Sequence, residues 1–193
     1  MKVLVAGATG ALGTELVPRL VAAGHDVSGM TRSATRCDAV LALGATPVVA
    51  DALDPDAVAA AVAAVAPDVI VHELTALSGA IDLRHFDRSF HETNRLRTEG
   101  TDHLLAAGRA LGVRRFVIQS YAGWPFARTG GAVKTENDPL DSAPAPAMRS
   151  TLAAIRHLED AVAGAPWTEG SSCATAASTA SGPRWPPTAS TPR

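Results

Sequence analysis

Three glycines stand three residues apart near the start of the chain, in the segment 7–13 (GATGALG). Each suits a phosphate-binding turn: Gly7 allows a sharp reversal, Gly10 leaves the backbone open to a phosphate, and Gly13 lets a following helix pack close to the preceding strand. The free N–H groups and the positive dipole end of that helix would then face the phosphates. The segment predicts a phosphate-binding loop, and a tight turn without a ligand is the alternative.

The residues around this loop alternate between short apolar runs and segments of helical period. The runs predict strands at 2–6, 26–30, 46–50 and 69–72, and the segments between them predict helices at 11–23, 34–43 and 54–66, the first bent at Pro18. The later pattern predicts a helix over 86–111, a strand over 115–119, a loop over 121–146 and a helix over 146–163. This order indicates an α/β protein with a doubly wound parallel sheet, the Rossmann fold, with helices on both faces.

Several segments beyond the glycine loop are similar to the motifs of one family. They are Asp51-Ala52-Leu53-Asp54 after the third strand, the fourth strand Pro67 to His72, Gly100-Thr101 before Leu104-Leu105-Ala106-Ala107, and Arg115-Phe116-Val117 before Ser120. With the glycine spacing, they resemble the NAD(P)-dependent epimerase/dehydratase family, an extended or atypical branch of the short-chain dehydrogenase/reductase superfamily. The resemblance covers about residues 1–164 and does not identify a substrate.

The resemblance implies a cofactor site and a catalytic residue. The cofactor would be lined by Gly7, Thr9, Gly10, Leu12, Gly13, Arg32, Asp51 and Leu74, with Asp51 near the adenine amino group. Ser120 would hold the oxygen of the substrate carbon that exchanges a hydride with C4 of the nicotinamide. The protein would then carry out oxidoreductase-like chemistry on a small sugar-like or carbonyl substrate.

The residues after the second strand bear on the choice between NAD and NADP. An acidic residue there would bind the ribose 2′-hydroxyl of NAD, whereas an arginine would meet the 2′-phosphate of NADP. The strand ends in Met30-Thr31-Arg32-Ser33, and Asp26 lies at its other end. We therefore expect NADP rather than NAD, with a solvated surface charge as the alternative interpretation of Arg32.

The sequence lacks the Tyr-x-x-x-Lys dyad of the family. If Glu159 aligns with the acidic residue that usually follows the dyad, the two dyad positions hold Thr151 and Ile155, which cannot do its proton transfer. Tyr121, the only tyrosine, is a second catalytic candidate that would approach the nicotinamide, or else it anchors the loop. A non-catalytic NADP-binding sensor and an inactive fragment are therefore alternatives to an enzyme.

The remaining polar residues give weaker signals. The spacing that places metal ligands on one helical face is absent, so we expect no metal at His85, His91, Glu92 and His103. His72 ends a buried strand and is expected to be a hydrogen-bonded core residue. Lys134 is expected to be a solvated loop charge. Asn94 could match a family asparagine, but it lies too far from Gly100 for the usual pattern.

Composition and charge exclude several classes of protein. Of the 193 residues, 47% are hydrophobic, and 17 basic against 19 acidic residues give a net charge of −2. No basic surplus points to nucleic acid, and no apolar run or leader points to a membrane or to secretion. Cys37 and Cys173 make no disulfide framework, which favours a reduced, cytoplasmic setting. In similar proteins the fourth and sixth helices commonly pair subunits, which would allow a homodimer.

The last 27 residues differ from the rest, since 21 of them are Ala, Ser, Thr, Pro or Gly. We expect a Rossmann domain over 1–166 and a disordered, low-complexity tail over 167–193, without the family's sixth strand or its substrate region. One GC-rich back-translation of 170–183, read two bases later, encodes Leu-Val-Leu-Arg-Tyr-Gly-Gly-Phe-Tyr-Gly-Leu-Gly-Pro, which resembles that strand. The hypothesis is a frameshift near Pro166, and resequencing the coding DNA tests it.

Overall fold

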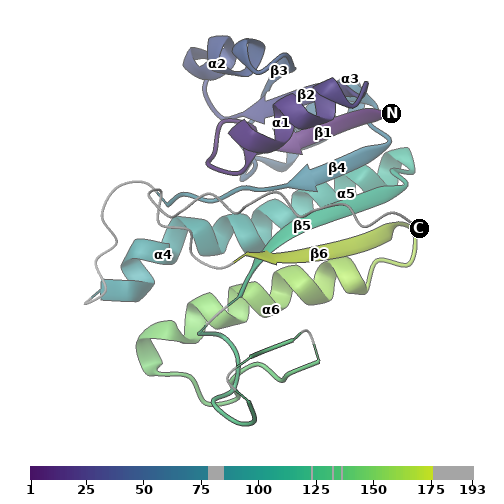
Figure 1. Cartoon of the computed structure of the whole chain (residues 1–193). Helices are drawn as coiled ribbons and strands as arrows, with labels where there is room; N and C mark the ends of the chain where they lie inside the picture. Colours follow the sequence, from purple (N-terminus) through teal and green to yellow (C-terminus); the bar gives the residue numbers. More distant parts are fainter. Residues whose placement is uncertain (78–84, 123, 132, 136, 176–193) are drawn as a thin grey trace, which may run out of the picture.

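Six parallel strands form one sheet in the order β3-β2-β1-β4-β5-β6 (Figure 1). The computed structural model describes residues 1–175 except 78–84, 123, 132 and 136. The strands are β1 (Lys2–Ala6), β2 (Asp26–Thr31), β3 (Thr46–Val49), β4 (Val69–His72), β5 (Arg115–Tyr121) and β6 (Glu169–Thr175). The predicted doubly wound sheet is confirmed. Its strand order reverses between β1 and β4, and this is where doubly wound sheets bind their ligands.

Helices cover both faces of the sheet. They are α1 (Gly13–Ala22), α2 (Cys37–Ala42), α3 (Pro55–Val65), α4 (Phe86–Arg95), α5 (Thr101–Leu111) and α6 (Arg149–Ala163), with short 3₁₀ turns at Ala34–Arg36 and Pro146–Met148. One apolar cluster joins the sheet to α3, α5 and α6, and the other joins it to α1 and α2. Alternate residues of β1 serve the two clusters: Leu4 belongs to the first, and Val5 to the second.

Local sequence explains where several of these helices begin and end. Asp54 caps α3, because its Oδ1 accepts hydrogen bonds from the backbone N–H groups of Asp56 (3.0 Å) and Ala57 (3.1 Å). Gly112 ends α5 in the left-handed conformation, with φ of +67°. The helix α1 continues through Pro18, where the sequence predicts a bend.

The predicted single helix over 86–111 is wrong in detail, because a π-helical segment interrupts it. This segment, Leu96–Gly100, joins α4 to α5, and Arg97 is among its buried residues. In Figure 1, α4 lies beyond the carboxyl ends of the strands, whereas α5 runs alongside the sheet. Isolated π-helical turns inside α-helices are frequent at functional sites.

The expected disorder from residue 167 onward is wrong for its first part, and the sixth strand is present. β6 pairs in parallel with β5 over seven residues, from Arg115 opposite Glu169 to Tyr121 opposite Thr175. Backbone hydrogen bonds make this pairing, so it does not require apolar side chains. Trp167 packs against the core, so the expected boundary between 166 and 167 divides a packed region. The predicted tail beyond residue 175 lies outside the described residues.

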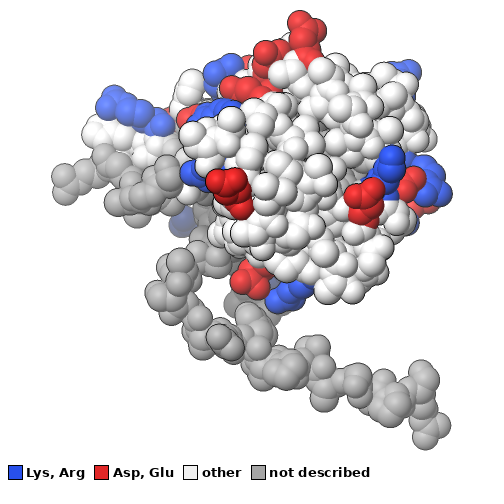
Figure 2. Space-filling model, turned by 90° about the horizontal axis from the view of Figure 1, so that it is seen from above, with Lys and Arg blue, Asp and Glu red and all other residues white. Residues whose placement is uncertain are grey.

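Surface charge, helix length and the two cysteines are each the subject of a prediction from composition. Figure 2 views the molecule from above and shows small groups of both charge signs around a broad uncharged area. Among the described helices, none combines the length and the apolar character needed to cross a membrane. Both cysteines are free thiols, with Cys37 half-buried and Cys173 exposed on β6.

Candidate functional site: a dinucleotide cradle at the sheet edge

In the loop between β1 and α1, a side chain would clash at Gly7 and Gly13 and would fit only tightly at Gly10. Gly7 has φ of +99°, and a Cβ built there would lie 2.8 Å from the carbonyl oxygen of Glu73. A Cβ on Gly13 would lie 2.3 Å from the carbonyl oxygen of Gly7, and one on Gly10 would lie 3.2 Å from the same atom. The backbone N–H of Gly10 also donates to that oxygen at 2.9 Å. These contacts make glycine a requirement of the turn itself, and such a glycine turn between a strand and a helix is the form that pyrophosphate-binding loops take. We call residues 7–13 the cradle.

The amino end of α1 is open to an anion. Leu12 occupies its N-cap position and makes no side-chain cap hydrogen bond. The N–H groups of Thr14 and Glu15 already donate to the carbonyls of Gly10 (3.0 Å) and Leu12 (3.1 Å), so an anion would meet the N–H groups that precede them. The helix dipole favours a negative charge at this end. The cradle and the helix end thus offer one continuous surface for phosphate oxygens.

Two arginines stand beside this cradle, and the sequence analysis identified only one of them. Arg32 follows β2 directly, and its exposed guanidinium pairs with Glu92 of α4. Arg36 lies in the 3₁₀ turn before α2, and its NH1 donates to Thr9 Oγ1 in the glycine loop at 3.3 Å. Arg36 could have been identified from the sequence, because it follows Arg32 by four residues. Arg36 therefore brings a second positive charge against the loop.

The other predicted cofactor residues lie along the same edge. Asp51 follows β3, and its Oδ1 accepts a hydrogen bond from the backbone N–H of Leu53 at 3.0 Å, which closes a turn. Leu74 follows β4 and is half-buried beside the core. The backbone N–H of Glu73 donates to the carbonyl of Ala6 at 2.8 Å. This bond fixes the end of β4 against the end of β1.

His72 is a buried, hydrogen-bonded core residue, as its position predicts. Its Nδ1 accepts a hydrogen bond from the backbone N–H of Leu74 at 3.2 Å, so its Nε2 carries the proton and donates to Thr101 Oγ1 at 3.1 Å. The hydroxyl of Thr101 in turn donates to the carbonyl of Arg97 at 2.8 Å. Burial lowers the pKa of His72 to about 4, which keeps the ring neutral. The chain of bonds holds the segment after β4 against the π-helical segment.

Ser120, the predicted catalytic serine, points into the molecule. Its side chain is buried at the end of β5, and its hydroxyl donates a hydrogen bond to Glu159 of α6. The two positions expected for the dyad are buried on the same helix: Thr151 Oγ1 accepts a hydrogen bond from Asn94 Nδ2 at 3.0 Å, and Ile155 is fully buried. Ser120 therefore ties β5 to α6, and Asn94 and Thr151 tie α4 to α6.

Tyr121 is half-buried directly after Ser120 and belongs to an aromatic group. Its ring centroid lies 6.3 Å from that of Trp124, which contacts Phe86 edge-on at 5.7 Å. Phe86 stacks on Phe90 at 4.4 Å. We call these four residues the aromatic group. Lys134 lies in the predicted loop, but the expected solvated charge is wrong: its side chain is half-buried, lies 3.8 Å from Asp138 and donates to the carbonyl of Thr129.

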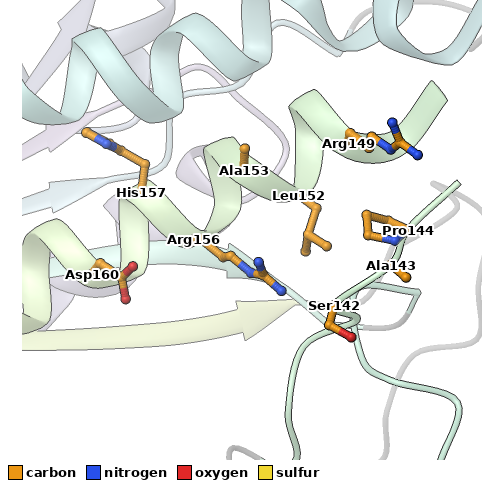
Figure 3. A pocket seen from close by; sticks show the side chains of 9 residues that line it. All are labelled: Ser142, Ala143, Pro144, Arg149, Leu152, Ala153, Arg156, His157 and Asp160. Carbon is orange, nitrogen blue, oxygen red and sulfur yellow. The ribbon is translucent and has the colours of Figure 1, made fainter. Parts of the chain in front are cut away.

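Two described hollows lie along α6 rather than at the cradle. The first, of about 640 Å³, is shown in Figure 3, where Arg149, Leu152, Arg156 and Asp160 of α6 lie opposite the segment 142–144. The second, of about 510 Å³, lies between α4 and α6. Neither is lined by a predicted cofactor or catalytic residue. Among the described residues, no three His, Cys, Asp or Glu side chains gather as metal ligands would.

Known proteins are similar to this chain in sequence. The chain is 48% identical over 164 residues to a 3-diazoavenalumate denitrifying reductase of a Streptomyces species, covering 84% of this chain and 52% of that protein. It is 38% identical over 120 residues to a 2-alkyl-3-oxoalkanoate reductase of Stenotrophomonas maltophilia, covering 62% of this chain and 33% of the relative. The chain thus spans about half, or less, of the length of these relatives.

Solved structures support the fold. A UDP-glucose 4-epimerase of Thermus thermophilus in complex with NAD superposes with a TM-score of 0.70 at 22% identity, covering 89% of this chain and 54% of that one. The family model described as NAD(P)H-binding matches residues 7–168. The match begins at the first glycine of the cradle and reaches beyond α6. The resemblance predicted from the sequence is confirmed, and the chain belongs to the NAD(P)H-binding family.

Proposed function

We propose that this chain binds NADP(H) in the cradle and presents the nicotinamide to a carbonyl-bearing substrate at the carboxyl ends of β4 and β5. The observation that carries the proposal is the cradle itself, in which Gly7, Gly10 and Gly13 leave the backbone bare. The cradle lies where the strand order reverses, between β1 and β4. A dinucleotide laid across this point places its adenosine toward β2 and β3 and its nicotinamide toward β4 and β5.

The two arginines favour NADP over NAD. Arg32 lies one residue past β2, where the adenosine ribose is held in this fold. Its present partner Glu92 is itself half-exposed, so a phosphate can replace that carboxylate at little cost. Arg36 already reaches the loop through Thr9. Two guanidinium groups on one side of the cradle suit the 2′-phosphate of NADP better than the ribose 2′-hydroxyl of NAD.

The relatives favour reduction as the reaction. The two named above are both reductases, and bound NADPH would supply a hydride to a substrate carbon. The residues of this chain would position the partners: Ser120 and Glu159 anchor the end of β5, and His72 anchors the segment after β4. Tyr121 then offers its hydroxyl as the proton donor beside the nicotinamide.

One observation favours a second function, that of an NADP-binding sensor without catalysis. The dyad positions hold Thr151 and Ile155, and both are buried. No side chain at these positions can donate a proton to a substrate. A titration with NADPH and a screen for turnover with carbonyl substrates distinguish the two functions, because a sensor binds without turnover.

Calorimetry with NADPH and NADH tests the cofactor assignment. We expect tighter binding of NADPH, and we expect Arg32→Asp to weaken NADPH binding at least tenfold while sparing NADH, since a charge-assisted contact contributes roughly 1.5–3 kcal/mol. Arg109→Asp, at an exposed position on α5, is the matched control and should change neither affinity. Equal losses for both dinucleotides would show that Arg32 does not contact the 2′-phosphate, and no binding of either would contradict the proposal.

A further inference from the structure

Arg97 is a buried cation that has no carboxylate partner among the described residues. Its side chain is 5% exposed, and among the described residues none accepts a hydrogen bond from its NH1, which is shielded from solvent. No described ion pair includes Arg97. Burying a guanidinium without a counter-charge is costly, and natural proteins rarely keep such a group unless it binds something.

The local backbone is built to hold Arg97 in this position. It belongs to the π-helical segment Leu96–Gly100, and its carbonyl accepts the hydroxyl of Thr101, which also binds His72. The side chain is therefore carried by a backbone that is fixed to the end of β4. Both the irregular helix and the unpaired charge are unfavourable locally, and such conflicts gather at functional sites.

Hydrogen bonds through Thr101 and His72 tie the backbone of Arg97 to the end of β4, in the nicotinamide half of the sheet edge, and the electrostatics agree with this location. Burial lowers the pKa of Arg97, and the ionised form of Tyr121 at the end of β5 raises it. The charge of Arg97 also contributes to the lowered pKa of His72 at the end of β4. Arg97 thus lies at the end of β4, on the far side of the switch point from Arg32 and Arg36.

The aromatic group extends from the same place. Tyr121 contacts Trp124, and Trp124 contacts Phe86 on α4. Tyr121 and Trp124 are both half-buried rather than enclosed in the core. A planar ring bearing an anionic group matches this combination of aromatic faces and one cation.

We propose that Arg97 is the anion-binding residue of the substrate site, where its guanidinium binds a negatively charged oxygen of an aromatic substrate. This assignment rests on the proposed function for the location of the substrate. Arg97 would supply a positive charge to a site whose dyad position holds Ile155 instead of the family's lysine. An acceptor for its free NH1 would come from the ligand rather than from the protein.

Benzoate and its neutral analogue benzamide are the probes. We expect benzoate to bind the NADP⁺-loaded protein, benzamide to bind at least tenfold more weakly, and Arg97→Met to weaken benzoate binding at least tenfold, all by calorimetry. Because Arg97→Met removes an unpaired buried charge, its melting temperature should match or exceed that of the wild type. Arg109→Met is the matched control on the adjoining helix and should leave benzoate binding unchanged.

Each other outcome overturns the proposal. Failure of the wild type to prefer benzoate over benzamide removes the anion site, and unchanged benzoate binding in Arg97→Met removes Arg97 from it. If Arg97→Met does not fold, Arg97→Lys and Arg97→Gln decide, because only the lysine variant should keep part of the preference. Benzoate is also titrated into the NADP⁺-free protein. A preference for benzoate over benzamide that persists there shows that the Arg97 site is intact even if the protein does not bind the cofactor.

Discussion

The two ends of the sheet are held in different ways. Val3, Leu4, Val5 and Ala6 of β1 are all buried, and their side chains enter apolar clusters on both faces of the sheet. In β6, Ser171, Ser172 and Cys173 are exposed, and the strand is held by backbone bonds to β5 and by α6 on one side. Side chains therefore specify the strand that carries the glycine loop, whereas pairing with a neighbouring backbone is enough to hold the last strand in the sheet.

A few close contacts supplement the backbone pairing of β6. Gly170 lies so close to α6 that a Cβ there would lie 2.7 Å from the carbonyl oxygen of Val162. Arg115 and Glu169 form an exposed ion pair at 2.7 Å, which contributes little to stability. Trp167, just before the strand, lies against Gly108 of α5. Removing residues 167–193 should therefore destabilise the protein, contrary to the expectation from composition.

The largest effect is expected at the cradle, with Gly7→Ala. The new Cβ would meet a backbone carbonyl at 2.8 Å in a conformation that alanine rarely adopts, which should cost about 4 kcal/mol of unfolding free energy and abolish NADPH binding. Gly24→Ala is the matched control, because Gly24 also has a positive φ, of +80°, but no atom lies within 4 Å of its Cβ position. Equal losses in urea unfolding for both variants would show that conformation alone, rather than the close approach, makes Gly7 necessary.

An intermediate effect is expected from the protonation of His72. Its pKa is about 4 in the folded protein against 6.5 in a model peptide, so the unfolded chain binds the proton more readily. The stability that neutral His72 contributes is complete above about pH 6.5 and is lost as the pH falls through about 4, a change of about 3 kcal/mol. Urea unfolding across this range measures it.

Two substitutions isolate the contribution of His72. His72→Gln should remove this component of the pH dependence, and His91→Gln, at an exposed position, should keep it. An identical pH dependence in the wild type and in His72→Gln would contradict the assignment.

The smallest effect tests the last strand directly. Ser171→Ala on β6 should change the unfolding free energy by less than about 0.5 kcal/mol, because its side chain is exposed. Val5→Ala in β1 should cost about 2 kcal/mol, since Val5 is fully buried. A comparable loss for both variants, measured by urea unfolding, would show that β6 side chains specify the edge as those of β1 specify the centre.

Much of the fold and the position of the candidate site could be predicted from local patterns. Strand β4 falls where the apolar run places it, and α3 begins after Asp54 and at Pro55, because caps and buried strands are local features. The glycine cradle was found for the same reason. The family resemblance predicts Ser120 as catalytic, and this stays a prediction; the structure adds that its hydroxyl binds Glu159, 39 residues away in sequence. A pattern along the chain does not contain that contact.

The sequence by itself determined the parallel sheet, the glycine loop and the basic residue after β2, since hydrophobic period and backbone freedom act over a few residues. The tertiary structure decided three things: that β6 joins the sheet, that Arg36 reaches Thr9 in the glycine loop, and that Arg97 is buried without a carboxylate partner among the described residues. Each depends on segments far apart in the chain. Strand pairing, guanidinium reach and the desolvation of a charge are set only once these segments have packed together.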